Sequence, residues 1–173
     1  MTFTNFEFKA SVKNCDIHEK QLLELHPKFA GEDDQTDTYF HSESGRLKLR
    51  EGNVENALIL YQRSDDPKAR ESKVILQEVT QDSRLKEILT TSNGILAVVK
   101  KKRRIYFIEN VKFHFDKLDQ LGDFVEVEAI DRTGNIPVKK LRDQCEYYRN
   151  FFGIDACQIL ADSYSDMILK TST

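Results

Sequence analysis

Residues 111–131, VKFHFDKLDQLGDFVEVEAID, decide the fold of this chain. Apolar and polar residues alternate over Val111–Leu118 and again over Asp123–Asp131, which is the period of a β-strand with one buried face. Only a few residues separate the two runs, so the strands must be antiparallel neighbours, because a parallel return needs a long crossover. The stretch therefore predicts a hairpin with one apolar and one charged face.

The same alternation extends outward along the chain. In residues 5–12, the apolar residues alternate with Asn5, Glu7, Lys9 and Ser11. Further strands are predicted near Gln35–His41, Arg46–Glu51, Ala57–Arg63, Lys73–Thr80, Ile95–Lys101 and Arg103–Glu109.

Helices are predicted near Asp16–His26, from Gln81 to about Thr91, and over the C-terminal part from about Pro137 to Lys170. Eight or nine antiparallel strands in one small domain favour a barrel or a curled sheet, with the helices packed outside. The acidic run at residues 32–34 has the composition of a solvated loop.

Length and charge limit the function classes. The chain has 173 residues, the length of one ordinary domain, and we expect a single domain over residues 1–173. Its 26 Lys and Arg residues are balanced by 29 Asp and Glu residues, which gives a net charge of −3. This balance excludes a generally basic nucleic-acid coat, so a site for a polyanion must come from local arrangement.

Three features of the sequence indicate where in the cell the protein is expected. The apolar stretches, such as residues 57–61, are too short to span a membrane. Charged residues within positions 1–10 stand where a signal peptide needs an apolar core. The three cysteines lack metal-site spacing, which is typical of reduced thiols. We therefore expect a cytoplasmic protein with no membrane partner.

Charged residues on the polar strand faces are the informative feature. A half-solvated sheet also alternates apolar with polar, so a wet face explains any single strand. Wet faces are usually rich in Thr and Ser, however, whereas Arg46, Lys48 and Arg50 fill one strand here and Glu126 and Glu128 fill another.

Like charges two residues apart need a counter-ion if their face is enclosed. Glu126 and Glu128 would lie about 6–7 Å apart on one face. Their repulsion is about 0.6 kcal/mol in water but about 2.5 kcal/mol at an effective dielectric near 20. Carboxylate ligands favour Mg²⁺ or Mn²⁺ over zinc, and an enclosed row of Arg and Lys requires an anion with several oxygens. A lumen with acidic side chains on one wall and basic side chains on another suits a metal-bound polyphosphate.

These stretches together resemble the CYTH superfamily, also called triphosphate tunnel metalloenzymes, which includes class IV adenylyl cyclases, thiamine triphosphatases and inorganic triphosphatases. The strand at 5–10 is similar to the family's E-x-E-x-K strand, and the order of the other motifs also matches. The matching stretches are NFEFKA at 5–10, QTDTYF at 35–40, GRLKLRE at 45–51, LILYQR at 58–63, RESK at 70–73, VVKKKRRIY at 98–106, VKFHFDKLDQLGDFVEVE at 111–128 and SYSDMIL at 163–169.

The resemblance implies an α+β fold: a closed antiparallel β-barrel of about eight strands, with helices outside and a tunnel for a triphosphate and Mg²⁺ or Mn²⁺. Glu7 and Lys9 would be catalytic. The phosphate-binding residues would be Lys9, Lys48, Arg50, Arg63, Lys101 and Arg103, with Arg70 as a further candidate. The residues serving metal or attacking water would be Glu7, Asp116, Glu126 and Glu128.

Two positions need separate comment. In the run at 100–104, Lys101 and Arg103 share one strand face and the other three cations share the opposite face; spacing to Tyr106 favours Lys101 and Arg103 for the tunnel. Asn5 stands where the family pattern has its first Glu. Its amide can offer a carbonyl oxygen to a metal but cannot act as a base, which puts metal affinity or catalysis in question.

The leading hypothesis is an enzyme that hydrolyses a small-molecule triphosphate, whether tripolyphosphate, thiamine triphosphate or ATP, by positioning and charge neutralisation. The alternatives are a class IV-type adenylyl cyclase that makes cyclic AMP and pyrophosphate, and a module that binds a polyphosphate without turnover. Nucleic-acid binding through residues 100–104 is disfavoured, because the run divides between two faces. The sequence leaves open whether the chain forms a homodimer. His114 is expected to be a hydrogen-bonded structural residue.

Overall fold

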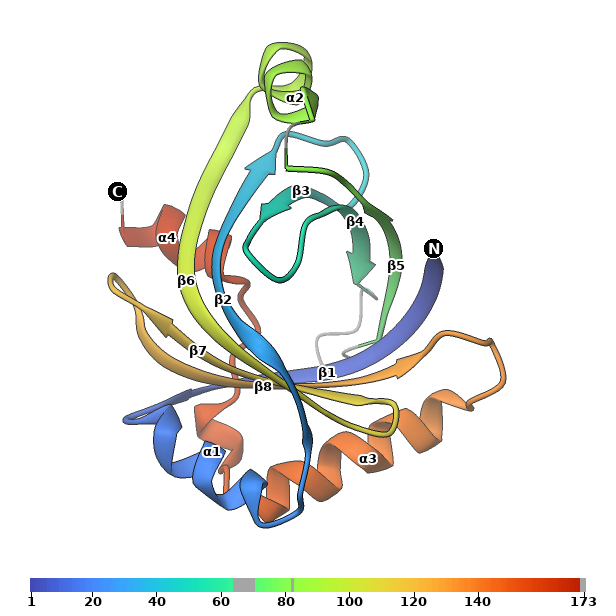
Figure 1. The fold of residues 1–173 in the computed structure, drawn as a ribbon, viewed down its shortest axis with the longest axis vertical. Coiled ribbons are helices and arrows are strands. Elements are labelled where there is room, and N and C mark those ends of the chain that lie inside the picture. Colours follow the sequence, from blue (N-terminus) through green and yellow to red (C-terminus); the bar gives the residue numbers. More distant parts are fainter. Residues whose placement is uncertain (64–70, 82, 172–173) are drawn as a thin grey trace.

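The computed structural model describes residues 1–63, 71–81 and 83–171. Antiparallel strands form a closed barrel in the order β1-β5-β4-β3-β2-β6-β7-β8, which confirms the predicted fold class (Figure 1). The strands are β1 Thr2–Val12, β2 Lys28–Phe40, β3 Arg46–Glu51, β4 Ala57–Arg63, β5 Glu71–Glu78, β6 Ile95–Ile108, β7 Val111–Leu118 and β8 Gly122–Asp131.

The hairpin predicted at 111–131 is the β7–β8 pair, with Val111 opposite Ala129 and Leu118 opposite Gly122. β1 closes the ring on the other side of β8, where Glu7 lies opposite Glu128 and Lys9 opposite Glu126. Residues opposite one another in an antiparallel pair point to the same face. Closure therefore brings the charged faces of β1, β7 and β8 together inside the barrel.

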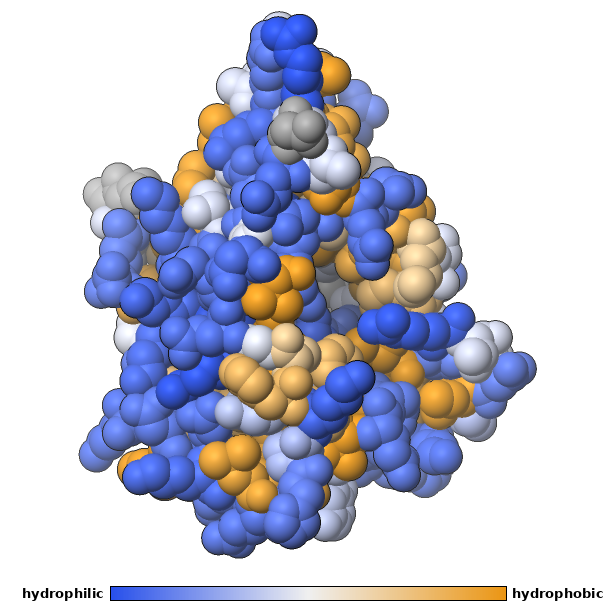
Figure 2. Space-filling model, in the orientation of Figure 1, coloured by the Kyte–Doolittle hydropathy of each residue, from blue (hydrophilic) through white to orange (hydrophobic). Residues whose placement is uncertain are grey.

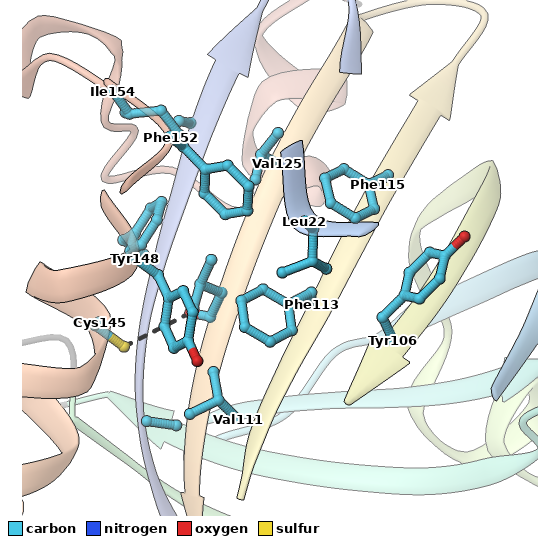
Figure 3. Packing of buried hydrophobic residues seen from close by; sticks show 14 of the residues in the cluster. Leu22, Tyr106, Val111, Phe113, Phe115, Val125, Cys145, Tyr148, Phe152 and Ile154 are labelled. Carbon is cyan, nitrogen blue, oxygen red and sulfur yellow. Dashed lines mark hydrogen bonds between the residues drawn. The ribbon is translucent and has the colours of Figure 1, made fainter. Parts of the chain in front are cut away.

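The helices are α1 Cys15–Leu23, α2 Leu85–Asn93, α3 Val138–Phe151 and α4 Tyr164–Thr171, with a short 3-10 helix, η1, at Ala156–Gln158. Outward apolar residues of β1, β7 and β8 form the main core with α1 and α3, and Figure 3 shows Phe113 and Phe115 facing Tyr148 and Phe152 across it. Phe113 lies 4.6 Å from Tyr148 between ring centroids. Among the described residues, no helix is long and apolar enough to cross a membrane.

The predicted division of 95–109 into two strands is wrong. β6 runs without a break through Ile95–Ile108 because no Gly or Pro interrupts its alternation. Its partner β2 begins at Lys28, seven residues before the predicted Gln35, and so includes the acidic run expected as a solvated loop. Across the pair, Glu32 lies opposite Arg104 and Asp33 opposite Arg103, so the acidic run continues the ladder with β6.

Asp33 is fully buried because it accepts hydrogen bonds from the turn between β3 and β4. Its carboxylate receives the backbone N–H groups of Val54 and Glu55 at 3.0 and 2.9 Å. A Cβ added at Gly52 would lie 2.3 Å from Asp33 Oδ1, so glycine is required there. The long C-terminal helix also divides: α3 ends at Phe151, Gly153 follows at φ +64°, and α4 begins at Tyr164.

Candidate functional site

Inward side chains surround a cavity of about 480 Å³ inside the barrel. Every strand contributes to its lining, and the space-filling view shows hydrophilic and apolar residues side by side around the hollow (Figure 2). Of the predicted phosphate set, Lys9, Lys48, Arg50, Lys101 and Arg103 line this cavity. The side chain of Arg63 and all of Arg70 lie outside the described residues.

Asp37 of β2 gathers three of these cations. Its Oδ2 accepts hydrogen bonds from Lys48 Nζ at 3.0 Å and from Lys101 Nζ at 2.8 Å, while its Oδ1 accepts from Arg50 Nε at 2.8 Å. Burial alone would raise the pKa of the Asp37 carboxyl, but Arg50, Lys101 and Lys48 hold that pKa well below its usual range. Asp37 is therefore an ionised anchor that fixes three cationic heads at one point.

Lys101 is a buried cation whose pKa is lowered. Burial, reinforced by Arg103, Arg50 and Lys48, lowers the pKa of Lys101 to about 7, although Asp37 opposes the shift. Lys101 is 5% exposed, whereas its neighbours Lys100 and Lys102 on the outer face are exposed. The structure thus places Lys101 and Arg103 in the cavity and the alternate residues of the run outside it.

Arg103 is held by Asp116. The two oxygens of Asp116 accept from Arg103 Nε at 2.6 Å and Nη2 at 2.5 Å, and Arg103 Nη2 also reaches Glu126 at 3.1 Å. The hydroxyl of Tyr164, from α4, donates to Asp116 Oδ2 at 2.7 Å. Burial favours the neutral carboxyl, but Arg103 lowers the pKa of Asp116. The Asp116 carboxylate thus lies behind Arg103 and orients it toward the cavity.

The acidic wall lies on β1 and β8. Asn5 Nδ2 donates to Glu128 Oε1 at 2.5 Å, and Glu7 is the register partner of Glu128. Burial raises the pKa of the Glu128 carboxyl, and the negative charges of Glu7 and Glu126 add to the rise. Glu126 differs, because Lys9 and Arg103 lie close to it and hold its pKa well below its usual range against the effect of burial.

His114 does not have the structural hydrogen bonds expected of it. Its side chain is 2% exposed and lines the cavity, yet neither ring nitrogen has a hydrogen-bond partner among the residues that the structure describes. Nδ1 lies 3.7 Å from Glu126 Oε2, which is too long for a hydrogen bond. Burial, with Arg103 and Lys112 nearby, lowers the pKa of His114 to about 3. A neutral imidazole therefore faces the cavity with its hydrogen-bonding capacity unused.

Glu55, in the turn between β3 and β4, holds the cations at another part of the lining. It accepts from Arg50 Nη1 at 2.8 Å and forms an ion pair with Lys112 of β7. Burial would raise the pKa of Glu55, but Lys112 and Arg50 hold it well below its usual range. Glu55 therefore links β3 to β7 across the lumen.

Comparisons with known proteins agree with this architecture. A family model for the CYTH domain matches residues 4–151. The chain belongs to the CYTH family. A comparison of the sequence with curated proteins finds no match.

Solved structures share the CYTH fold at low sequence identity. PH1012 from Pyrococcus horikoshii OT3 matches with a TM-score of 0.79 and 22% identity over 94% of this chain and 98% of its own. A Vibrio parahaemolyticus protein, named as a candidate adenylate cyclase, matches with a TM-score of 0.75 and 19% identity over 95% and 97%. Hippeastrum HpAC1, for which a dominant triphosphatase activity is stated, matches with a TM-score of 0.59 and 12% identity over 98% and 95%. These likenesses show a common fold.

The donor chemistry of this CYTH domain fits a hard divalent cation at the acidic wall. Asn5 Oδ1 is buried and has no hydrogen-bond partner within the described part of the chain, and it lies on the amide that contacts Glu128. An unsatisfied amide oxygen beside carboxylates is the donor type that Mg²⁺ and Mn²⁺ prefer. Over the ranges that the structure describes, however, no three His, Cys, Asp or Glu side chains are gathered as closely as a bound ion would require.

Several lining residues of the CYTH domain were not predicted from the sequence. The signal for Asp37 is its place in the quoted QTDTYF stretch, because residues 35–38 are all polar and do not alternate. The signal for Lys112 is alternation, because it is in phase with His114 and Asp116. Glu55 lies in a turn, and no periodicity relates it to the lumen. Tyr164 lies in a distant helix, and its signal is its place in the quoted SYSDMIL stretch.

Proposed function

We propose that this CYTH domain is a metal-dependent enzyme that hydrolyses a small-molecule triphosphate in its tunnel. The observation that carries the proposal is the convergence of buried cations from separate strands on one cavity beside a carboxylate wall. Lys9, Arg50, Lys101 and Arg103 are each at most 7% exposed, and all line that cavity. Buried cations attract multivalent oxyanions more strongly than solvated cations do, because the protein interior screens charge less than water does.

The cations would hold the phosphate oxygens, and the carboxylates would work at the terminal phosphorus. Glu7, with Lys9 beside it on β1, would orient the attacking water and accept its proton. The water oxygen bonds to the terminal phosphorus while the bond from that phosphorus to the bridging oxygen breaks, which releases orthophosphate and a diphosphate that keeps the bridging oxygen. Glu7, Glu126, Glu128 and Asn5 Oδ1 would hold Mg²⁺ or Mn²⁺ once their side chains come closer together than they lie in this structure, and the ion would neutralise phosphate charge.

The test is turnover of tripolyphosphate, thiamine triphosphate and ATP with Mg²⁺ or Mn²⁺, with detection of orthophosphate, pyrophosphate and cyclic AMP. We expect orthophosphate from at least one substrate. Cyclic AMP with pyrophosphate would instead identify a cyclase. No product from any substrate would contradict the enzyme proposal.

Neighbouring lysines on opposite faces of β6 provide a matched control for that assay. Lys101→Ala removes a cation from the cavity and should lower kcat/KM about 100-fold or more, the loss seen when one preorganised charge contact is removed. Lys100→Ala removes a cation from the outer face and should leave kcat/KM within twofold. Equal losses in both variants would show that the cavity cations are not the binding site.

A second candidate function is triphosphate binding without turnover, and Asn5 is the observation that favours it. Its amide replaces a carboxylate of the family pattern and donates to Glu128. Asn5→Glu distinguishes the two functions, provided the variant keeps the melting temperature of the wild type. Turnover that appears only in the variant would assign a binding role to the native chain, whereas turnover by the wild type would exclude that role.

A further inference from the structure

Among the described residues, one part of the cavity lining carries no charge. Ala57, Ile59 and Val74 form a buried apolar cluster on β4 and β5, against which Phe3, Tyr61 and Leu76 pack. All six residues line the same cavity as the cations. The alternate residues of β5 face away from the lumen, and among them Ile75 is 53% exposed. We call the inward cluster the apolar sector.

The strand register places the apolar sector directly beside the cations. Lys48 of β3 lies opposite Ile59 of β4, which in turn lies opposite Leu76 of β5. Two residues further along β3, on the same face, Arg50 lies opposite Ala57. A row of inward residues therefore passes from a cationic head group to an apolar side chain within one strand spacing of about 4.8 Å.

A second row completes the apolar wall. Tyr61 lies opposite Val74, and Val74 lies opposite Phe3 of β1. Lys48 Nζ is 5.7 Å from the centroid of the Tyr61 ring, so the tyrosine stands at the boundary between charged and apolar lining. The two rows form a continuous apolar surface from β4 to β1, next to the cluster that Asp37 holds.

An apolar wall adds no favourable binding free energy for an inorganic polyphosphate. All of its surface is charged or strongly hydrated oxygen, and an apolar contact gives it no stabilisation. An organic group attached to the phosphate chain would bury apolar area there. The cavity of about 480 Å³ is also within the range of about 300–1,000 Å³ typical of sites for organic ligands.

We infer that the tunnel takes a triphosphate monoester whose organic group lies on the apolar sector while its phosphates lie among the cations. The inference rests on the proposed function and narrows its substrate class, because an organic triphosphate should bind more tightly than inorganic tripolyphosphate. The residues that would determine this preference are Ile59, Tyr61 and Val74, none of which contributes a charge.

The test compares binding of phenyl triphosphate and methyl triphosphate to the wild-type chain, by calorimetry in EDTA so that metal-dependent turnover is absent. The two probes carry the same charge and differ in apolar area. We expect phenyl triphosphate to bind at least tenfold more tightly, which corresponds to about 1.4 kcal/mol. Equal affinities would overturn the inference and leave the proposed function intact. No binding of either probe would also overturn the inference, whereas the proposed function, which requires a metal, is tested separately by the turnover assay.

A pair of adjacent residues on β5 locates the preference. Val74→Asn places an amide in the apolar sector and should reduce the ratio of the methyl triphosphate to the phenyl triphosphate dissociation constant to threefold or less. Ile75→Asn makes the same change on the exposed face and should retain the full preference. A full preference in Val74→Asn would place the organic group elsewhere and overturn the assignment.

Discussion

Asp37 shows at the scale of one residue how the site is held ready. Its carboxylate is 1% exposed and contacts Lys48, Arg50 and Lys101. Three cations placed so close together would repel one another in an interior of low dielectric. A single buried anion between them lowers that repulsion and also fixes their positions, so the heads need little rearrangement when an oxyanion arrives.

Replacing Asp37 by Asn should therefore destabilise the fold. Breaking a buried ion pair by removing one partner costs about 3–5 kcal/mol, because the remaining charges stay buried. We expect Asp37→Asn to lower the free energy of unfolding by about this amount in denaturant titrations, and tripolyphosphate to restore part of it by supplying negative charge. Asp143→Asn, in an exposed pair with Lys139, should change it by less than about 0.5 kcal/mol. Equal effects would refute the anchoring role of Asp37.

Lys101 should couple triphosphate binding to proton uptake. In the free protein its pKa is about 7, so at pH 8 most of the amine is neutral. Phosphate oxygens favour the charged amine and raise this pKa on binding. The Lys101 contribution to affinity is thus fully present below about pH 7 and is lost as the pH rises through the pKa of the bound state.

Calorimetry of tripolyphosphate binding at pH 8, in HEPES and in Tris, measures the number of protons taken up. The wild type should take up more protons than Lys101→Arg, in which the cation is always charged, and the titration of the ligand itself cancels in this comparison. The same proton number in both proteins would show that Lys101 is already charged before the ligand binds.

At the scale of elements, α4 connects the C-terminal part of the chain to the lumen. Tyr164 is 3% exposed and packs with inward residues of β2, β6 and β8. Lys9 Nζ lies 3.9 Å from the centroid of its ring, and its hydroxyl donates to the Asp116 carboxylate that holds Arg103. One helical side chain therefore positions two lumen cations from different strands.

Tyr164→Phe tests this connection. Loss of the hydroxyl leaves a buried Asp116 oxygen with one donor fewer, and an unmade hydrogen bond of this kind costs about 1–3 kcal/mol. We expect a loss of unfolding free energy in that range together with weaker binding of tripolyphosphate. Tyr147→Phe makes the same change at a tyrosine of α3 that is 58% exposed, and it should alter neither quantity. Unchanged binding in Tyr164→Phe would limit the tyrosine to a packing role.

The elements differ in how well the sequence predicts them. Alternation located β1, β3, β4, β7 and β8 within a few residues, because each strand has one apolar face and turn residues at its ends. The prediction for β2 begins too late, because Glu32 and Asp33 look solvated until their register partners Arg104 and Arg103 are known. The pairing of strands distant in sequence decides such cases, and local patterns do not contain it.

At the scale of the whole molecule, ring closure creates the site. Lys9, Arg50 and Lys101 lie on three strands, and none of the three has a neighbour in sequence that explains its burial. The alternation predicted which residues share a face, and hence that Lys101 and Arg103 belong together. It could not predict Glu55 or Tyr164, whose places in the lumen depend on where a turn and a helix dock after closure.

A crystal structure of the chain with tripolyphosphate and Mn²⁺ is the most direct measurement of the central claim, that the inward cations receive a triphosphate. The account predicts phosphate oxygens inside the barrel within about 3.2 Å of Lys48, Arg50 and Lys101, with the metal at the wall formed by Glu7 and Glu128. A triphosphate bound only on the outer face of β6, or a tunnel that stays empty at saturating ligand, would contradict it.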